Sequence, residues 1–348
     1  MESIEHVHVT LLDSLRNVSE VSCDTLDVQV AKDLGPFRDV TSNQAIALGE
    51  LTKTTPEGKL QYEELLRRAT EDARTWLHAA WPEVDLATLA VEVMMVRLVI
   101  QFAPYVTHYM HVQTNPKWAY STEKTRRNAQ RIVEIFKKID PSIKTKRVCI
   151  KIPATWEGIA ACRELEAGEG SRSPPIATLA TTLFCMEQAV LAAHAGCTYI
   201  APYVNELKVH FEPGYVDQHK AFNLTRLAQR HYVDKSHRTQ VLAASLTSVD
   251  EVMQLAGIQH VTVSPHLLQG LAAEPTADWD GKLGAFFAAD PQERWDAGGF
   301  ATWCGDESEY RIAFTRSGRG KAEEKLVQAI NIFSDKQDEL EALARRFL

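Results

Sequence analysis

The sequence lacks the features that direct a chain to nucleic acid or to a membrane. Its formal net charge is −8, and no cluster of lysine and arginine interleaved with aromatic residues marks a surface for a nucleic acid or an anionic membrane. No apolar run approaches the length of a membrane span, and the acidic start MESIEHVHVTLLDSL is without the basic region of a signal peptide. We therefore expect a cytoplasmic protein that binds neither nucleic acid nor membranes and whose partner is a small molecule.

Cysteine is also scarce, with six residues among 348 and no C-x-x-C pair. Most of the six stand in apolar surroundings, where a reduced cysteine packs as a small hydrophobic side chain, so we expect free thiols. The histidines His6, His8, His108 and His111 have no cysteine or carboxylate partners at the spacing of a zinc site. We expect neither a metal nor a cofactor.

Short β-branched runs alternate along the chain with longer helical patterns, which indicates βα units and a parallel sheet. The candidate strands span residues 20–24, 38–43, 107–114, 148–152, 176–181, 198–203, 240–245 and 260–264. Amphipathic helices are expected at 122–138, 155–167, 185–195, 217–231 and 248–256. Eight strands predict one α/β domain over residues 1–348, a (β/α)8 (TIM) barrel at about 18–270 followed by a C-terminal helical extension at about 271–348. The apolar residues Leu343, Phe347 and Leu348 in that extension are candidates for a homodimer interface.

Lys151 lies inside an otherwise apolar run, VCIKIP at 148–153, that is typical of a buried strand. Removing an ammonium group from water disfavours its charged form, so a partly desolvated lysine can present a neutral amine to a carbonyl and form a Schiff base. A strand-end lysine whose stem packs while its head reaches water is the structural alternative. Position alone does not separate the two.

Polar side chains stand at the ends of most candidate strands. In a barrel of this class the active site gathers at the carboxyl ends of the strands, so such residues are predicted to face one cavity. They are Asp24, Asn43, Asn115, Lys151, Thr181, Tyr203 and Ser245. Aspartate and asparagine at strand ends also cap the next helix, which explains some of these residues without a function. Capping does not explain Lys151.

The stretch IKIPATWEGIAACRELE, residues 150–166, resembles the lysine signature of the transaldolase family. Other segments agree with this resemblance: DTLD at 24–27, TSN at 41–43, VSPHLL at 263–268, and the run from residue 307 that looks like the family's closing helices. The resemblance covers essentially the whole chain. It implies a TIM-barrel enzyme of carbohydrate metabolism, a transferase or a lyase, that uses no cofactor.

The resemblance also implies roles for individual residues. Lys151 would attack the carbonyl of a ketose donor, and Asp24 would shuttle protons during carbinolamine dehydration and carbon–carbon cleavage. Asn43 would hold a donor hydroxyl, and Thr181 would position a water that passes the proton. The protonated imine would then act as an electron sink for the carbanion left by cleavage.

The chain departs from the family's pattern where relatives bind the sugar phosphate. The arginine that follows the family's S-P-F-x-G motif falls on Glu206, and the arginine of G-A-S-F-R falls on Thr247, so that Ser245 alone survives. A glutamate in place of an arginine exchanges attraction for a phosphate with repulsion, which is worth several kcal/mol at an effective dielectric of about 20. These three substrate-binding positions predict an altered substrate.

Further departures touch proton transfer. The family's third-strand glutamate falls on Asn115, whose amide cannot act as a base at neutral pH, and its fifth-strand asparagine falls on Leu179. Tyr203 stands where transaldolases have phenylalanine. The related fructose-6-phosphate aldolases use an active-site tyrosine with their catalytic water, so Tyr203 is expected to take over part of the relay, although a tyrosine at a strand end can also serve packing alone.

Three functions fit these residues. The first is a class I aldolase or transaldolase-like enzyme that joins or separates an unphosphorylated ketose donor and an aldehyde acceptor. The second is an ordinary pentose-phosphate transaldolase, moving dihydroxyacetone from sedoheptulose 7-phosphate to glyceraldehyde 3-phosphate, with Lys208 or His210 supplying the missing cation. The third is a non-catalytic binding protein, and the joint presence of four family residues argues against it: Lys151, Asp24, Asn43 and Thr181.

Overall fold

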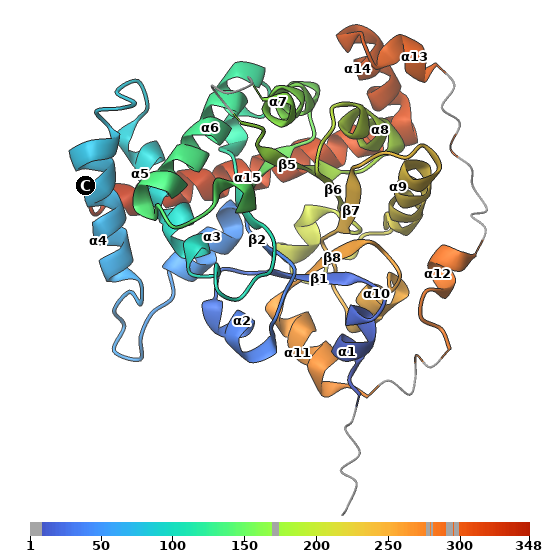
Figure 1. Ribbon diagram of the computed structural model, residues 1–348, viewed down its shortest axis with the longest axis horizontal. Coiled ribbons are helices and arrows are strands. Elements are labelled where there is room, and N and C mark those ends of the chain that lie inside the picture. The colour runs from blue at the N-terminus through green and yellow to red at the C-terminus, as the bar shows by residue number, and fades with distance from the viewer. Residues whose placement is uncertain (1–8, 169–173, 276–278, 280, 290–294, 296–298) are drawn as a thin grey trace, which may run out of the picture.

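The computed structural model of the chain is built on a closed barrel of eight parallel strands (Figure 1). The structure describes residues 9–168, 174–275, 279, 281–289, 295 and 299–348. The strands are β1 (Glu20–Asp24), β2 (Val40–Thr41), β3 (Met110–Gln113), β4 (Val148–Pro153), β5 (Ala177–Leu183), β6 (Tyr199–Pro202), β7 (Gln240–Ala243) and β8 (His260–Val263). Each strand pairs in parallel with the next, and β8 pairs with β1. The predicted (β/α)8 barrel is confirmed.

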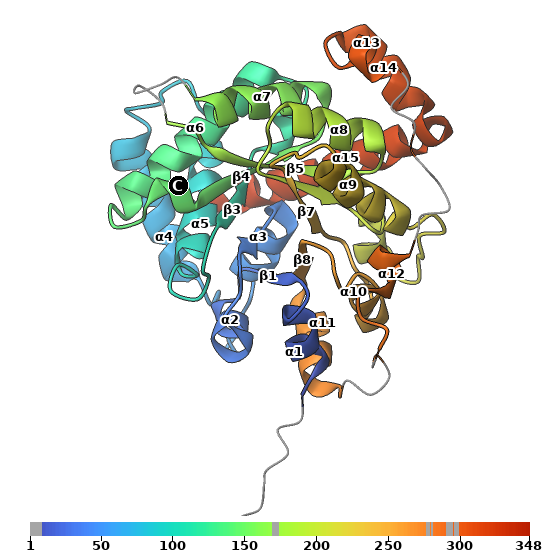
Figure 2. The same ribbon diagram turned by 45° about the vertical axis from the view of Figure 1, so that its right-hand side comes forward.

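Helices surround the strands on the outside of the barrel (Figure 2). They are α1 (Leu11–Arg16), α2 (Val28–Leu34), α3 (Gln44–Leu51), α4 (Glu63–Asp72), α5 (Leu86–Ile100), α6 (Thr122–Ile139), α7 (Trp156–Ala167), α8 (Met186–His194), α9 (Phe222–Asp234), α10 (Val249–Gln254), α11 (Pro265–Ala273), α12 (Ala285–Ala288), α13 (Phe300–Trp303), α14 (Glu307–Arg316) and α15 (Lys321–Arg345). The described short helical turns are η1 (Ala73–Leu77), η2 (Pro116–Trp118), η3 (Thr145–Arg147), η4 (Leu207–His210) and η6 (Ser317–Gly320).

Several predicted elements are shorter in the structure, among them the strand at 107–114, which is reduced to β3, and the strand at 240–245, which ends with β7. Two others are shortened where a polar side chain binds the local backbone. The strand predicted at 38–43 is reduced to the two residues of β2, since the Asn43 side chain accepts a hydrogen bond from the Ile46 N–H and caps α3. The helix predicted at 217–231 begins only at Phe222. Before it, the Asp217 carboxylate accepts hydrogen bonds from the N–H groups of Glu206 and His219 and holds a loop.

Successive side chains of β4 point alternately to the outside and to the inside of the barrel. Ile150 and Ile152 belong to the apolar layer between the strands and the helices, whereas Cys149 packs with Leu179 and other side chains inside the barrel. Successive side chains of a strand point to opposite faces, so Lys151 shares the interior face with Cys149. The run that the sequence identified as a buried strand therefore carries its lysine into the barrel.

The long helix α15 closes one end of the barrel. It contacts α3, η2 and η4, which follow the carboxyl ends of β2, β3 and β6, and Figures 1 and 2 show it crossing behind the strands. Its Phe333 is fully buried among the side chains of the barrel interior. Leu343 is buried, whereas Phe347 and Leu348 are only partly buried against the core and Phe347 lies under the Arg67 guanidinium, so a homodimer interface at these residues stays a prediction.

The cysteines and histidines have structural positions in the described chain. All six cysteines are free thiols and five are buried, as predicted. His111 is buried inside the barrel with its Nε2 3.1 Å from Asp39 Oδ2, and His108 packs edge-on against Tyr109. His6 and His8 lie outside the described residues. No helix in the described ranges is long and apolar enough to cross a membrane.

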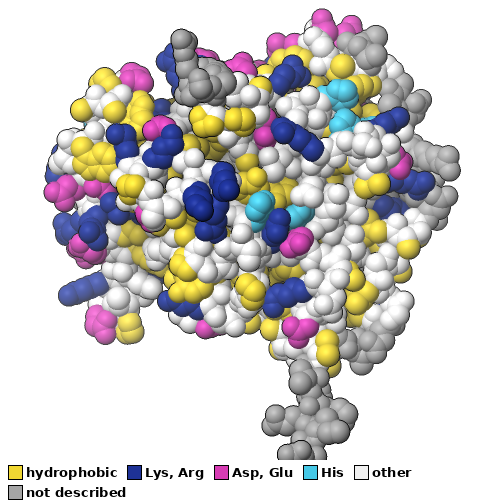
Figure 3. Space-filling model, viewed as in Figure 1, with side chains coloured by type: hydrophobic (Ala, Val, Ile, Leu, Met, Phe, Trp, Pro, Cys, Tyr) yellow, Lys and Arg dark blue, Asp and Glu magenta, His cyan; other side chains and the backbone are white. Residues whose placement is uncertain are grey.

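Histidines that are partly or fully withdrawn from water are expected to make the fold sensitive to acid. Histidine side chains gather in two places on the face shown in Figure 3. Burial lowers the pKa of His260 to about 4, and it also lowers the pKa of His194, His231 and His237, whose rings contact one another at α8 and α9. An unfolded chain has histidine pKa values near 6.5, so below that pH it binds more protons than the native state. The free energy of unfolding therefore has its full value above about pH 6.5 and decreases as the pH falls toward 4. His260 alone accounts for a decrease of about 3 kcal/mol.

Urea unfolding at about pH 7.5 and about pH 5 measures this loss. A glutamine at position 260 does not titrate, so His260→Gln should lose about 2 kcal/mol less stability than the wild-type protein between these two pH values. Equal losses in both proteins would show that His260 does not carry the effect.

Candidate active site

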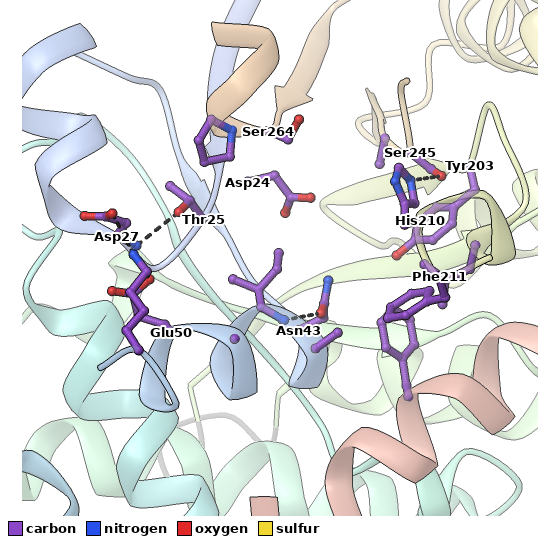
Figure 4. Close-up of a pocket in the computed structure, with 18 residues that line it drawn as sticks. Asp24, Thr25, Asp27, Asn43, Glu50, Tyr203, His210, Phe211, Ser245 and Ser264 are labelled. Carbon is purple, nitrogen blue, oxygen red and sulfur yellow. Dashed lines mark hydrogen bonds and ion pairs between the residues drawn. The ribbon is translucent and has the colours of Figure 1, made fainter. Parts of the chain in front are cut away.

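A pocket of about 450 Å³ opens at the carboxyl ends of β1, β2, β6, β7 and β8. Asp24, Asn43, Tyr203 and Ser245, which the sequence predicted to face one cavity, line it together, and Ser264 joins them from the end of β8. Figure 4 shows Asp24, Asn43 and Tyr203 extending toward the same space from different elements. Phe333 of α15 also lines the pocket. This is the end of the barrel at which TIM-barrel enzymes place their chemistry.

Asp24 is held at the mouth of the pocket by its neighbours in the barrel. Its Oδ1 accepts a hydrogen bond of 2.6 Å from the Thr41 hydroxyl, and that hydroxyl lies 2.6 Å from the hydroxyl of Thr262 on β8. No described residue donates to the second carboxylate oxygen of Asp24. The side chain is thus oriented by β2 while one oxygen stays available to a bound molecule.

Lys151 lies deeper, inside the barrel and beside the pocket-lining Tyr203. Its side chain is 2% exposed, it forms no ion pair with any residue in the described ranges, and its Nζ stands 5.9 Å from the centre of the Tyr203 ring. A cation over an aromatic face gains about 1–2 kcal/mol, much less than the cost of an unpaired buried charge. This position favours chemical use of the amine over a purely structural role.

Thr181 stands at a strained point of β5. The next residue, Thr182, has a φ of 57°, which is rare for a β-branched side chain, and the pairing of β5 with β6 is irregular between Ala180 and Leu183. The Thr181 hydroxyl is fully buried and finds no hydrogen-bond partner in the described part of the chain. Irregular strand pairing near an active site re-aims a side chain, and the sequence pattern gave no sign of it.

Asn115 is committed to local structure and does not line the pocket. Its side-chain oxygen accepts a hydrogen bond of 3.0 Å from the Lys117 N–H and caps η2, and its own N–H donates to Asn128 on α6. Asn128 in turn donates to Glu92, which is paired with Arg131 at 2.6 and 2.7 Å. This network buries the segment that follows β3.

Glu206 and Thr247, the positions of the family's two arginines, also lie outside the lining of the pocket. The Glu206 carboxylate accepts hydrogen bonds from the Tyr215 hydroxyl and from Gln328 of α15, the latter at 2.7 Å. Thr247 is exposed, and its N–H donates to Glu251. Glu206 therefore connects the loop after β6 to α15 through hydrogen bonds. The sequence had predicted that it faces the substrate.

Of the two cations considered as replacements, one reaches the pocket and one does not. The Nζ of Lys208 lies 4.2 Å from the centre of the Tyr215 ring and forms an ion pair with Glu212 at 3.5 Å. His210 lines the pocket, and its Nε2 lies 2.9 Å from Ser245 Oγ (Figure 4). Burial lowers the pKa of His210, so its ring is neutral at neutral pH.

The backbone holds Ser245 in an uncommon conformation that aims its hydroxyl at His210. Its φ is 62°, in the left-handed region, and its carbonyl accepts hydrogen bonds from both the N–H and the side-chain amide of Asn205. Non-glycine residues in this region cost about 1 kcal/mol or more and persist where the surroundings fix them, often at functional sites.

The charged side chains around the pocket are mostly acidic. Lys53 is the one lysine or arginine among the described lining residues, and its ammonium is shared by Asp27 at 2.7 Å and Glu50 at 2.8 Å. With Asp24 added, the lining carries three carboxylates and one cation that is already paired.

Comparison with known proteins agrees with this geometry. The family model described as Transaldolase/Fructose-6-phosphate aldolase matches residues 21–343. The chain belongs to this family. Proteins named Transaldolase are similar to it over nearly their full length: that of Acidobacterium capsulatum is 30% identical over 345 residues, covering 97% of this chain and 96% of its own, and that of Alteromonas mediterranea is 30% identical over 353 residues, covering 97% and 98%.

Membership in the transaldolase/fructose-6-phosphate aldolase family makes the chain an enzyme of the aldolase or transferase kind that acts on small sugar-type molecules. At about 30% identity to these relatives it is a divergent member. The family assignment rests on the whole chain, whereas the substrate depends on the few residues around the pocket.

Proposed function

We propose that this enzyme makes or breaks a carbon–carbon bond through a Schiff base between Lys151 and a ketose donor that carries no phosphate. The observation that supports it best is a buried lysine without an ion pair in the described chain, beside the pocket-lining Tyr203, together with Asp24, the lining carboxylate that no described cation pairs with. An amine inside the barrel and a carboxylate at its mouth are the two groups that imine-based aldol chemistry requires.

The first half of the reaction forms the imine. The Nζ lone pair of Lys151 adds to the donor carbonyl, so that a C–N bond forms and the π pair moves to the oxygen. The oxygen takes a proton and the nitrogen gives one up, which leaves a carbinolamine. A second protonation of that oxygen lets the C–O bond break, and water leaves behind a protonated imine. Asp24 supplies and recovers these protons, with a water held by the free hydroxyl of Thr181 as carrier.

The second half breaks the carbon–carbon bond. Asp24 takes the proton of the donor hydroxyl on the carbon to be released, an aldehyde forms there, and the electron pair of the broken bond moves into the iminium to give an enamine. Addition of the enamine to an acceptor aldehyde makes the enzyme a transferase. Protonation of the enamine, followed by hydrolysis of the imine, makes it a lyase.

The charges around the pocket support a donor without a phosphate. Two unit charges of like sign 4 Å apart repel by about 4 kcal/mol at an effective dielectric of 20, and the pocket carries carboxylates but no unpaired lysine or arginine among its described lining residues. The neutral pair of His210 and Ser245 instead matches a hydroxyl, which can donate to one and accept from the other. The ordinary phosphate-dependent transaldolase is less well supported, because Lys208 is engaged by Glu212 and Tyr215.

Borohydride trapping with mass spectrometry tests this proposal, because reduction turns an imine into a stable amine at the lysine that formed it. We expect an adduct on Lys151 with dihydroxyacetone and with fructose at concentrations no higher than those needed with fructose 6-phosphate. Lys146, exposed just before β4, provides the matched control, and Lys146→Ala should be trapped like the wild-type protein. Preferential trapping by fructose 6-phosphate would contradict the proposed donor.

A cation introduced at the neutral pair should change the preference. His210→Arg places a guanidinium beside Ser245, where it can bind a phosphate through two hydrogen bonds. We expect the concentration of fructose 6-phosphate that gives half-saturation to fall about tenfold, while the half-saturating concentration of fructose does not fall. An equal change for both donors would show that position 210 does not face the phosphate end of the molecule.

A further inference from the structure

Phe211 is an aromatic side chain at the pocket that takes no part in the core of the protein. It lies directly after η4, it is 38% exposed, and it belongs to neither of the apolar clusters that the described residues form. It nevertheless lines the pocket, and Figure 4 shows it on the opposite side from Asp27 and Glu50. A single exposed phenylalanine is ordinary, but one that continues an apolar surface into a pocket marks a place where a ligand binds.

The apolar surface continues from Phe211 into the pocket. Ile46 of α3, Leu207 of η4 and Phe333 of α15 line the same cavity. Leu207 and Phe333 also belong, with Tyr203, to the apolar cluster that fills the barrel interior. Exposure to solvent decreases from Phe211 through the partly buried Ile46 to the fully buried Phe333. The pocket therefore has an apolar lining that extends from the solvent to the interior of the barrel.

The charged groups at the rim of the pocket are paired with one another. The Lys53 ammonium is held by Asp27 at 2.7 Å and by Glu50 at 2.8 Å, and the Glu50 carboxylate also accepts a hydrogen bond from the Tyr62 hydroxyl. An acceptor with several hydroxyl groups would have to break these pairs or leave its hydroxyls without partners against the apolar lining, and both are costly. An apolar substituent avoids this cost and is withdrawn from water.

We propose that Phe211 binds an apolar substituent, an aromatic ring or a branched alkyl group, on the acceptor aldehyde. This inference rests on the proposed function and adds the class of acceptor. The donor has to reach Lys151, which is buried, so an acceptor that joins the bound donor arrives from the solvent side. Its substituent then lies nearer the rim of the pocket, where Phe211 is exposed. Phe211 determines which aldehyde binds and contacts no reacting atom.

Such an acceptor reacts with the enamine that the donor forms on Lys151. With dihydroxyacetone as donor, Asp24 takes a proton from the carbon next to the protonated imine, and the enamine results. The enamine carbon bonds to the aldehyde carbon, the π pair of the aldehyde moves to its oxygen, and Asp24 returns its proton to that oxygen. Water then hydrolyses the imine, which restores the amine and releases a ketose that carries the apolar group.

Binding of an unreactive alcohol tests the inference without the reaction. Phenylethanol has the ring and chain of phenylacetaldehyde but no carbonyl, and a titration followed by NMR of the alcohol measures its dissociation constant. We expect Phe211→Ala to bind it about tenfold more weakly than the wild-type protein, because the apolar area of one ring is lost from the contact. Trp76, which is 37% exposed and outside the pocket lining, provides the matched control. Trp76→Ala should bind the alcohol as the wild-type protein does.

Initial rates of carbon–carbon bond formation test the same inference in the reaction, with dihydroxyacetone at saturation as donor. The wild-type protein should have a higher kcat/KM for phenylacetaldehyde than for glyceraldehyde. The ratio of the two values should fall about tenfold in Phe211→Ala and stay at the wild-type value in Trp76→Ala. Phe211→Leu, which keeps an apolar side chain, should retain most of the preference.

The outcomes separate this inference from the proposed function. Failure of borohydride to trap dihydroxyacetone on Lys151 would overturn the Schiff base, and the alcohol titration would still decide whether Phe211 binds an apolar group. A trapped adduct together with a preference for glyceraldehyde would overturn the inference alone. Equal affinity of the wild-type protein and Phe211→Ala for phenylethanol would overturn it as well, and would leave Phe211 as a partner of Lys336, whose Nζ lies 5.9 Å from the centre of its ring.

Discussion

Replacing Lys151 with methionine should lower the rate of carbon–carbon bond cleavage by about four orders of magnitude or more, because the covalent intermediate can no longer form. The same change should stabilise the protein. It removes a buried amine that has no ion pair in the described chain while keeping an unbranched stem of similar length, and we expect a gain of about 1–3 kcal/mol. A coupled assay of aldehyde release and urea unfolding of the same preparation measure the two effects together.

Asp24→Asn is the informative comparison for this variant. It keeps the amine but loses the proton acceptor, so its rate should fall by about 10²–10⁴ while Lys151 can still form an adduct slowly. A Lys151→Met protein that kept a rate within about tenfold of wild type would exclude the imine mechanism, whatever the result with Asp24→Asn.

Arg131→Met should destabilise the fold by about 3–5 kcal/mol, the largest stability loss that we expect from a single substitution away from the pocket. Arg131 and Glu92 are each 5% exposed and are joined by two hydrogen bonds of 2.6 and 2.7 Å, and the same carboxylate accepts from Asn128. Without the guanidinium, the buried carboxylate stays unpaired or takes up a proton, and either response is costly. Urea unfolding measures the loss.

A neighbouring arginine of the same helix provides the control. Arg127 pairs with Glu123 on the exposed side of α6, so Arg127→Met should cost less than about 1 kcal/mol. The double variant in which both Glu92 and Arg131 become methionine should recover much of the loss, because no charge is then left buried. Equal effects at positions 127 and 131 would show that burial does not set the value of the pair.

The barrel could be predicted from the sequence because its strands are short apolar runs whose signal is local. The same alternation that brings Lys151 to the interior also places Gln113 there, two residues before Asn115, but a glutamine in a strand has no special meaning until its partners are known. The pairing register of β3 and β4 identifies Lys151 as the neighbour of Gln113. That register is a property of the assembled barrel and is not visible in either strand alone.

Other features of the site are set by contacts that span large separations in sequence. Glu206 was expected to face a substrate, yet its direction is fixed by Tyr215 nearby and by Gln328 on α15. The backbone strain at Thr182 and Ser245 follows from the strand irregularity and from Asn205, respectively, and no propensity of threonine or serine predicts it. Local sequence patterns thus identified the candidate site residues, and tertiary contacts determine which of these residues lie together at the pocket.

The position of α15 also has a consequence for the order in which the enzyme is built. A ribosome makes the chain from its N-terminus, so all eight strands, Lys151 and Asp24 are synthesised before Phe333, which forms part of the pocket wall. Because domains begin to fold during synthesis, the barrel strands are available to pair before this part of the pocket wall exists. α15 is the last helix to be synthesised, so its docking completes the pocket wall at Phe333.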